Sequence, residues 1–184
     1  MESVDVARLV IEALNDLNVA YMVVGSLASN VYGVARNTQD ADFVIETDDD
    51  LASIHQRLRE CFRAEPQIGF ETVQMSTKHV LYHRDTDFRV ELFVLSNDPH
   101  DRERFRRRVW LEQEGNRVCL PTVEDVIVQK LRWRRKKDIA DVTNVIDAQH
   151  PNLDWPYILR WVEAHGSGEA LNAVCAELGI APGE

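Results

Sequence analysis

Residues 21–46, YMVVGSLASNVYGVARNTQDADFVIE, decide the fold of this chain. The stretch opens with four apolar residues that end at Gly25 and Ser26, and a short block, residues 27–32, follows them. This order predicts a strand, a tight turn and a short helix. Residues 41–45 then form a second apolar run of the strand type. The stretch therefore predicts two strands that are joined through a turn and a helix.

The Gly25-Ser26 turn has the features of a phosphate-binding site. Gly25 has no side chain to keep a ligand away from the backbone, and the start of a helix offers free N–H groups and a positive dipole end. The hydroxyl of Ser26 is one more donor. The alternative interpretation is that the two residues only turn the chain and cap the helix.

Two carboxylates stand at the start of the second strand. Asp40 and Asp42 are two positions apart, so their side chains share one face of the strand. They would repel each other and lose hydration unless a cation or a hydrogen-bond network compensates them. A hard divalent cation, Mg²⁺ above all, fits such oxygen ligands. The alternative interpretation is a pair of exposed aspartates at a strand entrance.

The spacing Gly33-x-x-Arg36-x-Thr38-x-Asp40-x-Asp42 completes a pattern that begins at the Gly-Ser turn. This pattern resembles the nucleotidyltransferase superfamily related to DNA polymerase beta. It is most similar to the bacterial minimal and abortive-infection (AbiEii-like) nucleotidyltransferases, and less similar to the aminoglycoside nucleotidyltransferases. The resemblance is strong over residues 21–46 and weak over most of the remaining chain.

The resemblance implies a nucleoside triphosphate such as ATP as substrate and one or two Mg²⁺ ions held by Asp40 and Asp42. Within the motif it implies nucleotide-binding roles for Arg36 and Thr38, next to the Gly-Ser turn. It also implies a third carboxylate on a neighbouring strand. Glu91 is the candidate, because it is a conspicuous acid in the run FRVELFV. Most relatives have aspartate there, so Glu91 is expected either to reach the metal or to act as general base.

A third informative stretch begins at Pro121. Thr122 precedes two acids as a helix N-cap does, and apolar residues follow at helical spacing. The predicted helix carries Lys130, for which the resemblance implies triphosphate binding. The string KLRWRRKKDIAD continues to two acids three positions apart, Asp138 and Asp141. The resemblance to the third AbiEii-like motif gives Asp141 a place in the nucleotide site, and Asp138 is either part of that site or a helix cap.

The formal net charge of −10 does not describe the distribution of the basic residues. Two short clusters hold many of them: Arg102, Arg104, Arg106, Arg107 and Arg108, and then Lys130, Arg132, Arg134, Arg135, Lys136 and Lys137. These clusters would suit nucleotide phosphates and a polyanionic acceptor such as tRNA, and Trp133 could stack on a base. Solvated helix ends and a core tryptophan are the alternative.

The predicted architecture is α/β: a nucleotidyltransferase-like mixed sheet flanked by helices, with a C-terminal helical portion. We predict an α/β core over residues 1–120 and a helical portion over residues 121–184 that packs on it. Helices are expected over residues 1–20, 49–62, 155–165 and 169–178. Two or three strands are expected in residues 70–95, a polar connector or short helix in 99–108, and a hairpin in 109–120 with its turn at 114–116.

Composition narrows the class of protein. With 184 residues, 45% of them hydrophobic, the chain can bury a core of its own. It has no secretory signal pattern at the start, and no apolar run that would cross a membrane. Its three cysteines are odd in number and widely spaced, which argues against a disulfide framework. We therefore expect a cytoplasmic protein without a membrane partner.

Together these features predict a Mg²⁺-dependent nucleotidyltransferase that moves a nucleoside monophosphate from a nucleoside triphosphate onto an acceptor. The expected acceptor is RNA, tRNA in particular, or a protein, and a toxin-antitoxin or phage-defence setting with a partner protein is expected from the resemblance. Two alternatives stay open. One is a catalytically weak nucleotide-binding regulator or antitoxin-like module, and the other is an antibiotic nucleotidyltransferase of the aminoglycoside type, for whose cationic substrate the acidic composition would be suited.

Overall fold

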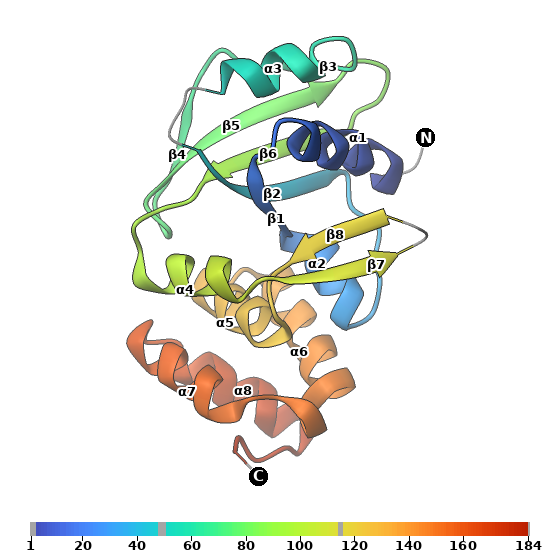
Figure 1. The fold of residues 1–184 in the computed structure, drawn as a ribbon. Helices are drawn as coiled ribbons and strands as arrows, with labels where there is room; N and C mark the ends of the chain where they lie inside the picture. The colour runs from blue at the N-terminus through green and yellow to red at the C-terminus, as the bar shows by residue number, and fades with distance from the viewer. Residues whose placement is uncertain (1–2, 48–50, 114–115, 184) are drawn as a thin grey trace.

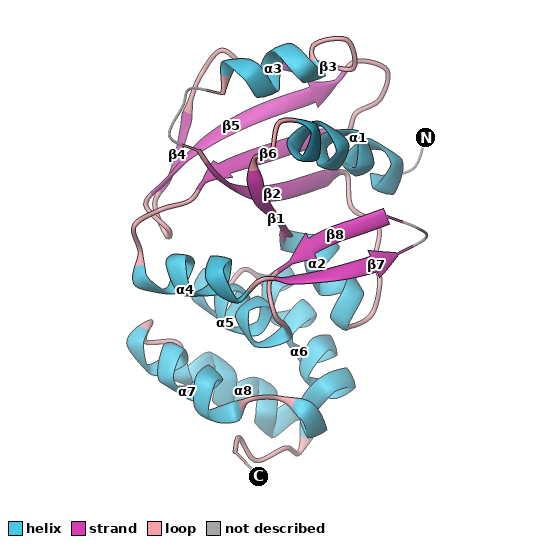
Figure 2. Cartoon of the chain, in the orientation of Figure 1, coloured by secondary structure: helices cyan, strands magenta, loops and turns pink. Residues whose placement is uncertain are grey.

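The structure is a computed structural model, and it describes residues 3–47, 51–113 and 116–183. Its described part contains a mixed sheet, helices on the sheet and a group of helices at the C-terminal end (Figures 1 and 2). None of the described helices combines the length and the apolar character that crossing a bilayer requires. The predicted α/β class with a mixed sheet is confirmed.

In the described part of the chain the main sheet has six strands in the order β1-β2-β6-β5-β3, and β4 pairs with β5 outside that path. The strands are β1 (Ala20–Val24), β2 (Asp40–Glu46), β3 (Phe62–Ala64), β4 (Gly69–Glu71), β5 (Ser76–His83) and β6 (Arg89–Val94). β2 and β6 run parallel, and the other paired strands run antiparallel. The two or three strands expected in residues 70–95 are thus confirmed.

The register of the central strands decides where the acids of the predicted site lie. Asp42 stands opposite Glu91 in the β2–β6 pair, and Asp40 stands opposite Arg89. On the other side of β2, Val24 stands opposite Asp42. The end of β1, and with it the turn that follows, is therefore next to the same carboxylate.

Helices pack around this sheet (Figure 1). α1 (Ser3–Asp16) and α3 (Ala52–Leu58) contact each other and the strands, while α2 (Gly25–Tyr32) contacts β1 and β2 as well as the C-terminal helices α5 and α6. The remaining elements follow in chain order: α4 (Pro99–Arg107), β7 (Val109–Gln113), β8 (Asn116–Leu120), α5 (Val123–Trp133), α6 (Lys136–Gln149), η1 (His150–Asn152), α7 (Trp155–Ala164) and α8 (Gly168–Leu178).

Two hydrophobic clusters form the interior. The first joins α1, α3 and the main sheet, and its last member is Val126 on α5. The second joins α5 to α8 and begins with the next residue, Ile127. Because neighbouring residues of α5 point to different sides of the helix, this single helix buries one side against the sheet core and another against the C-terminal helices.

Some helices and turns differ from their predicted bounds. The predicted helix over residues 49–62 is too long, since α3 ends at Leu58 and Phe62 pairs with His83 as part of β3. The start of that prediction and the centre of the predicted hairpin turn, residues 49–50 and 114–115, lie outside the described residues. Residues 99–107 form a helix. Thr122 caps α5 as predicted, because its hydroxyl accepts a hydrogen bond from the backbone N–H of Asp125.

Candidate active site

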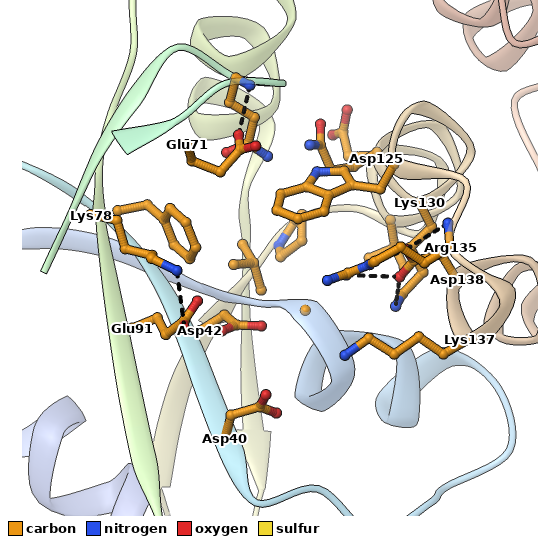
Figure 3. Close-up of a pocket in the computed structure, with 18 of the residues that line it drawn as sticks. Asp40, Asp42, Glu71, Lys78, Glu91, Asp125, Lys130, Arg135, Lys137 and Asp138 are labelled. Carbon is orange, nitrogen blue, oxygen red and sulfur yellow. Dashed lines mark hydrogen bonds and ion pairs between the residues drawn. The ribbon is translucent and has the colours of Figure 1, made fainter. Parts of the chain in front are cut away.

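One wall of a cavity of about 370 Å³ carries the three predicted carboxylates. Asp40 and Asp42 come from β2 and Glu91 comes from β6, and all three side chains line this cavity together with Gly25 (Figure 3). The parallel register places Asp42 beside Glu91, although 49 positions separate them in the chain. The structure thus brings the three acids to one cavity, as the resemblance implied, and their role in metal binding stays a prediction.

Gly25 joins the predicted turn to these acids. Its backbone has φ +64°, in the left-handed region, and a Cβ atom on it would lie 2.0 Å from Oδ2 of Asp42. Only glycine combines that backbone conformation with so close an approach. The turn and the carboxylate are therefore built as one unit, in which the backbone at Gly25 stays open to the cavity.

Ser26 has a different place from its neighbour. It is buried, it does not line the cavity, and its hydroxyl accepts a hydrogen bond of 2.8 Å from Nη2 of Arg36. The alternative that Ser26 caps the helix is wrong, because the N-cap position of α2 is Val24 and no side chain caps it. In this conformation Ser26 fixes Arg36 instead of facing the cavity.

Asp141 is the centre of a buried cluster behind the cavity. Its carboxylate accepts two hydrogen bonds from Arg36, of 2.9 and 3.0 Å, and one of 2.6 Å from Nζ of Lys130. The hydroxyl of Ser29 donates to the same group at 3.3 Å. Burial alone would raise the pKa of Asp141, but the hydrogen bonds and charges of Arg36 and Lys130 outweigh it and lower that pKa to about 2. The carboxylate is therefore ionised and holds both cations in place.

The opposite wall of the cavity carries three basic residues, together with Asp125 and Asp138. Lys130, Arg135 and Lys137 line it; Arg135 and Lys137 extend toward the carboxylates, whereas Nζ of Lys130 is turned to Asp138 and Asp141 (Figure 3). Arg135 donates to Asp138 at 2.6 and 3.1 Å, and Asp138 also accepts from the backbone N–H of Arg135 in a capping box. The helix-cap interpretation of Asp138 is thus confirmed. Arg135 lies over the ring of Trp133, 4.4 Å from its centroid, so the tryptophan stacks on a side chain of the protein.

The acids of the first wall differ in their pKa. Burial raises the pKa of Asp42 to about 7, and the negative charges of Glu91 and Asp40 act in the same direction. For Asp40 burial also opposes ionisation, but the hydrogen bond from Thr38 and the charges of Lys137 and Arg89 lower its pKa overall. Thr38 lies outside the cavity and supports Asp40 through this hydrogen bond. Without a cation the site thus favours one ionised aspartate over two.

These residues fit a divalent cation in their chemistry. Three carboxylates on two adjacent strands supply the hard oxygen ligands that Mg²⁺ prefers, and a positive ion would offset both the burial and the repulsion that raise the pKa of Asp42. Within the described ranges, no three acidic, histidine or cysteine side chains are already arranged to hold one ion. Asp40, Asp42 and Glu91 are the residues that would hold it.

Sequence reasoning missed two partners of Glu91. Nζ of Lys78 lies 3.2 Å from Oε1 of Glu91, and Nε of Arg89 lies 3.4 Å from the same oxygen. Arg89 could have been noticed, since it is two positions before Glu91 on one strand face. Lys78 comes from β5, and only the antiparallel β5–β6 register brings it there. Other lining residues that were not predicted include Glu71, Gln74, Phe93, Asp125 and Gln129.

The two basic clusters are largely engaged within the protein. In the first, Arg102 pairs with Glu46, and Arg104, which is only 2% exposed, pairs with Asp101. In the second, Arg132 pairs with Asp98. Further pairs and contacts are Arg107 with Glu124 and Asp125, Arg108 with the carbonyl oxygen of Phe105, and Arg134 with the carbonyl oxygen of Gly166. Most of these charges are therefore already compensated by internal partners, which neither the polyanion surface nor the solvated helix ends of the alternative anticipated. Trp133 is partly exposed and lines the cavity, so it is not a core tryptophan.

Known proteins give an independent comparison. Residues 4–169 match the model of a family described as "Nucleotidyltransferase of unknown function (DUF6036)". No curated protein matches the chain. Among solved structures, an antigenic nucleotidyltransferase-like protein from Paracoccidioides brasiliensis is similar, with 20% identity, a TM-score of 0.54 and coverage of 76% of this chain and 74% of that one.

The antibiotic-resistance factor ANT(2'')-Ia is similar in two further structures. Its crystal structure in complex with adenylyl-2''-tobramycin has 11% identity and a TM-score of 0.60, and covers 89% of this chain and 97% of that one. Its solution structure has 11% identity and a TM-score of 0.59, and covers 97% and 98% of the two chains. At these identities the likeness shows a shared fold.

Proposed function

Because the chain belongs to the DUF6036 family of nucleotidyltransferases, we propose that it transfers a nucleoside monophosphate from a nucleoside triphosphate to an acceptor. The observation that carries the proposal is a cavity in which three clustered carboxylates lie across from basic side chains. Asp40, Asp42 and Glu91 line one wall, and Lys130 and Arg135 line the other. A triphosphate and a divalent cation together need this combination of carboxylates and basic groups.

In the proposed reaction the oxygen of an acceptor hydroxyl attacks the α-phosphorus of the triphosphate and gives up its proton to water or to a carboxylate of the site. The new bond joins that oxygen to phosphorus, the bond between the α-phosphorus and the bridging oxygen breaks, and pyrophosphate leaves with the bond electrons. A divalent cation held by Asp40 and Asp42, or two such ions, would neutralise phosphate charge and polarise the phosphoryl group. We assign Glu91 to this metal site because it stands in register with Asp42.

The basic wall would bind the rest of the nucleotide. Lys130 is held by Asp141, so its ammonium is oriented before the triphosphate arrives. Arg135 and Lys137 would neutralise the negative charge that develops on pyrophosphate as it leaves. The open backbone at Gly25 would approach a phosphate closely. Arg36, Ser26 and Asp141 would act from behind the cavity by fixing Lys130 and the start of α2.

For the acceptor we propose RNA, tRNA in particular, or a protein, in a toxin-antitoxin or phage-defence setting with a partner protein. A small cationic acceptor is the second candidate. It is favoured by the internal pairing of the arginine clusters, by Glu71 on the cavity wall, and by the fold shared with ANT(2'')-Ia. The third possibility is a regulator that binds the nucleotide without transferring it, and the assay described next distinguishes it from an enzyme.

A transfer assay tests this proposal. The purified protein is incubated with Mg²⁺ and each triphosphate in turn, labelled at the α-phosphate, together with total tRNA, a protein extract or a panel of amino sugars. Label transfer that disappears with Asp40→Asn supports the proposal and names the acceptor class. Nucleotide binding without transfer to any acceptor would favour the regulator, and absence of binding would overturn the proposed site.

A further inference from the structure

Glu91 is surrounded by positive charge in this conformation. Its Oε1 atom is the partner of both Lys78, at 3.2 Å, and Arg89, at 3.4 Å, and its side chain is only 12% exposed. Arg89 also reaches Asp40, with 3.4 Å between Nη2 and Oδ2. Figure 3 shows Lys78 directed at Glu91 from the strand on the far side of the acid cluster. Lys78 and Arg89 thus occupy the carboxylate of Glu91, which would have to be free to bind a metal ion.

We propose that Lys78 is a built-in counter-ion of Glu91 that a divalent cation must displace before Glu91 can bind it. The inference rests on the proposed function, in which Glu91 belongs to the metal site. A metal ion and an ammonium group cannot both satisfy the same carboxylate oxygen at full strength, because each competes for its charge. Lys78 therefore stabilises the metal-free site and weakens its affinity for free metal.

The surroundings of Lys78 allow this exchange. Its side chain is 29% exposed, so the ammonium can move without entering an apolar interior. Its Nζ lies 5.8 Å from the ring centroid of Phe93, the residue paired with it across β5 and β6, and this ring can hold the cation after Glu91 turns away. Arg89 differs, because it bridges Glu91 and Asp40 and comes from the same strand as Glu91.

One consequence concerns the order of binding. A triphosphate brings its own negative charge to the basic wall and carries a metal ion with it. The metal then gains phosphate ligands in addition to the carboxylates, and these offset the loss of the Lys78–Glu91 pair. The site is therefore expected to load metal together with the nucleotide and to hold free metal weakly.

The test measures Mn²⁺ binding to the nucleotide-free protein by electron paramagnetic resonance. Lys78→Met keeps the apolar stem and removes the charge, so it should bind Mn²⁺ about three- to tenfold more tightly than the wild type. Its metal-free form should melt at a lower temperature, and saturating Mn²⁺ should close the difference. Lys78→Arg should resemble the wild type in both measurements. Lys136→Met is the matched control, since Lys136 is exposed and does not line the cavity.

Each outcome has a distinct meaning. Mn²⁺ affinity that is unchanged or weaker in Lys78→Met, while Asp42→Asn abolishes binding, would overturn the counter-ion inference and leave the metal site standing. An equal gain in affinity from Lys136→Met would also overturn it, because the effect would then come from net charge alone. Absence of Asp42-dependent Mn²⁺ binding, with and without triphosphate, would overturn the proposed metal site and the inference with it.

Discussion

Nζ of Lys130 on α5 donates a hydrogen bond of 2.6 Å to Oδ2 of Asp141 on α6, and the same carboxylate holds Arg36 from the loop after α2. This contact ties the nucleotidyltransferase motif near the N-terminus to the C-terminal helices. The contact also indicates the structural role of Asp141. The aspartate orients a cation that faces the cavity, and it does so from a buried position, with only 5% of its side chain exposed.

Removal of that anchor should cost stability and nucleotide affinity together. Asp141→Asn removes the acid partner of the half-buried Arg36 and leaves the buried Lys130 with only the more distant Asp138, at 3.6 Å, so the free energy of unfolding should fall by about 3 kcal/mol. Urea unfolding measures this fall, and calorimetric titration with a triphosphate should show weaker binding. A stable Asp141→Asn variant with wild-type nucleotide affinity would show that Asp141 is not the anchor.

The low pKa of Asp141 predicts a dependence of stability on acid. Its pKa is about 2 in the folded protein and about 3.9 in an unfolded chain, so the unfolded state binds protons first as pH falls. The stabilisation, about 2.5 kcal/mol for such a difference, is present above pH 4 and is lost as pH falls toward 2. The free energy of unfolding, measured with urea between pH 5 and 2, should fall less steeply with falling pH in Asp141→Asn than in the wild type. The same dependence on pH in both proteins would contradict the low pKa of Asp141.

Asp42 predicts the opposite dependence for the metal-free protein. Its pKa is raised to about 7, so the folded state binds the proton more tightly than the unfolded state does. The associated stability is present below pH 4 and is lost as pH rises through 7. Asp42→Asn should therefore unfold with a free energy about 1 to 3 kcal/mol higher than the wild type at pH 8 without metal. A less stable variant under those conditions would refute the destabilisation that we attribute to the burial of Asp42 and to the charges of Glu91 and Asp40.

Two glycines provide a matched pair of variants. Gly25 and Gly166 both have positive φ, +64° and +59°, but a Cβ on Gly166 would meet nothing within 4 Å, whereas one on Gly25 would meet Asp42. Alanine at Gly166 should cost about 1 kcal/mol through backbone strain alone. Alanine at Gly25 should cost more and should abolish nucleotide binding. Similar losses of stability in both variants, with nucleotide binding intact, would contradict the close approach of the turn to Asp42.

Replacement of Gln129 by leucine is expected to stabilise the protein. Gln129 is 9% exposed, and neither atom of its amide has a hydrogen-bond partner among the residues that the structure describes. Gln129→Leu keeps a similar volume and removes the uncompensated polar group, so the free energy of unfolding should rise by about 1 kcal/mol. A loss of that size would mean that the amide has a partner in solution. Gln149→Leu, which removes a hydrogen bond to the carbonyl oxygen of Tyr32, should destabilise and serves as the control.

Local features of the chain made much of this site predictable. The turn at Gly25 and the aspartates of β2 lie within one continuous stretch, where strand periodicity fixes which side chains share a face. Glu91 was recognisable because an acid in an apolar strand needs an explanation. Lys78 was not predictable in the same way, because its place depends on the pairing of β5 with β6. The roles of Ser26 and Arg36 also depend on a contact with Asp141, more than a hundred positions away.

The same limit explains the arginine clusters. Sequence shows that positive charges are close together along the chain, but it does not show which acids face them. Arg102 forms an ion pair with Glu46 on β2, and Arg132 forms one with Asp98, directly before α4. The first pair joins α4 to the sheet and the second joins α5 to the start of α4, so both depend on the tertiary packing of these elements. Net positive charge along a segment is therefore a weak guide to a binding surface.

We propose above all that nucleotidyl transfer depends on Asp40, Asp42 and Glu91, in the cavity that Lys130 also lines. The most direct measurement is the rate of pyrophosphate release from a triphosphate in the presence of Mg²⁺ and the acceptor identified by label transfer, for the wild type and for Asp42→Asn. Both proteins must first be shown to be folded by circular dichroism. We predict a fall of at least about a thousandfold in the variant. Release at the wild-type rate from folded Asp42→Asn would contradict the account.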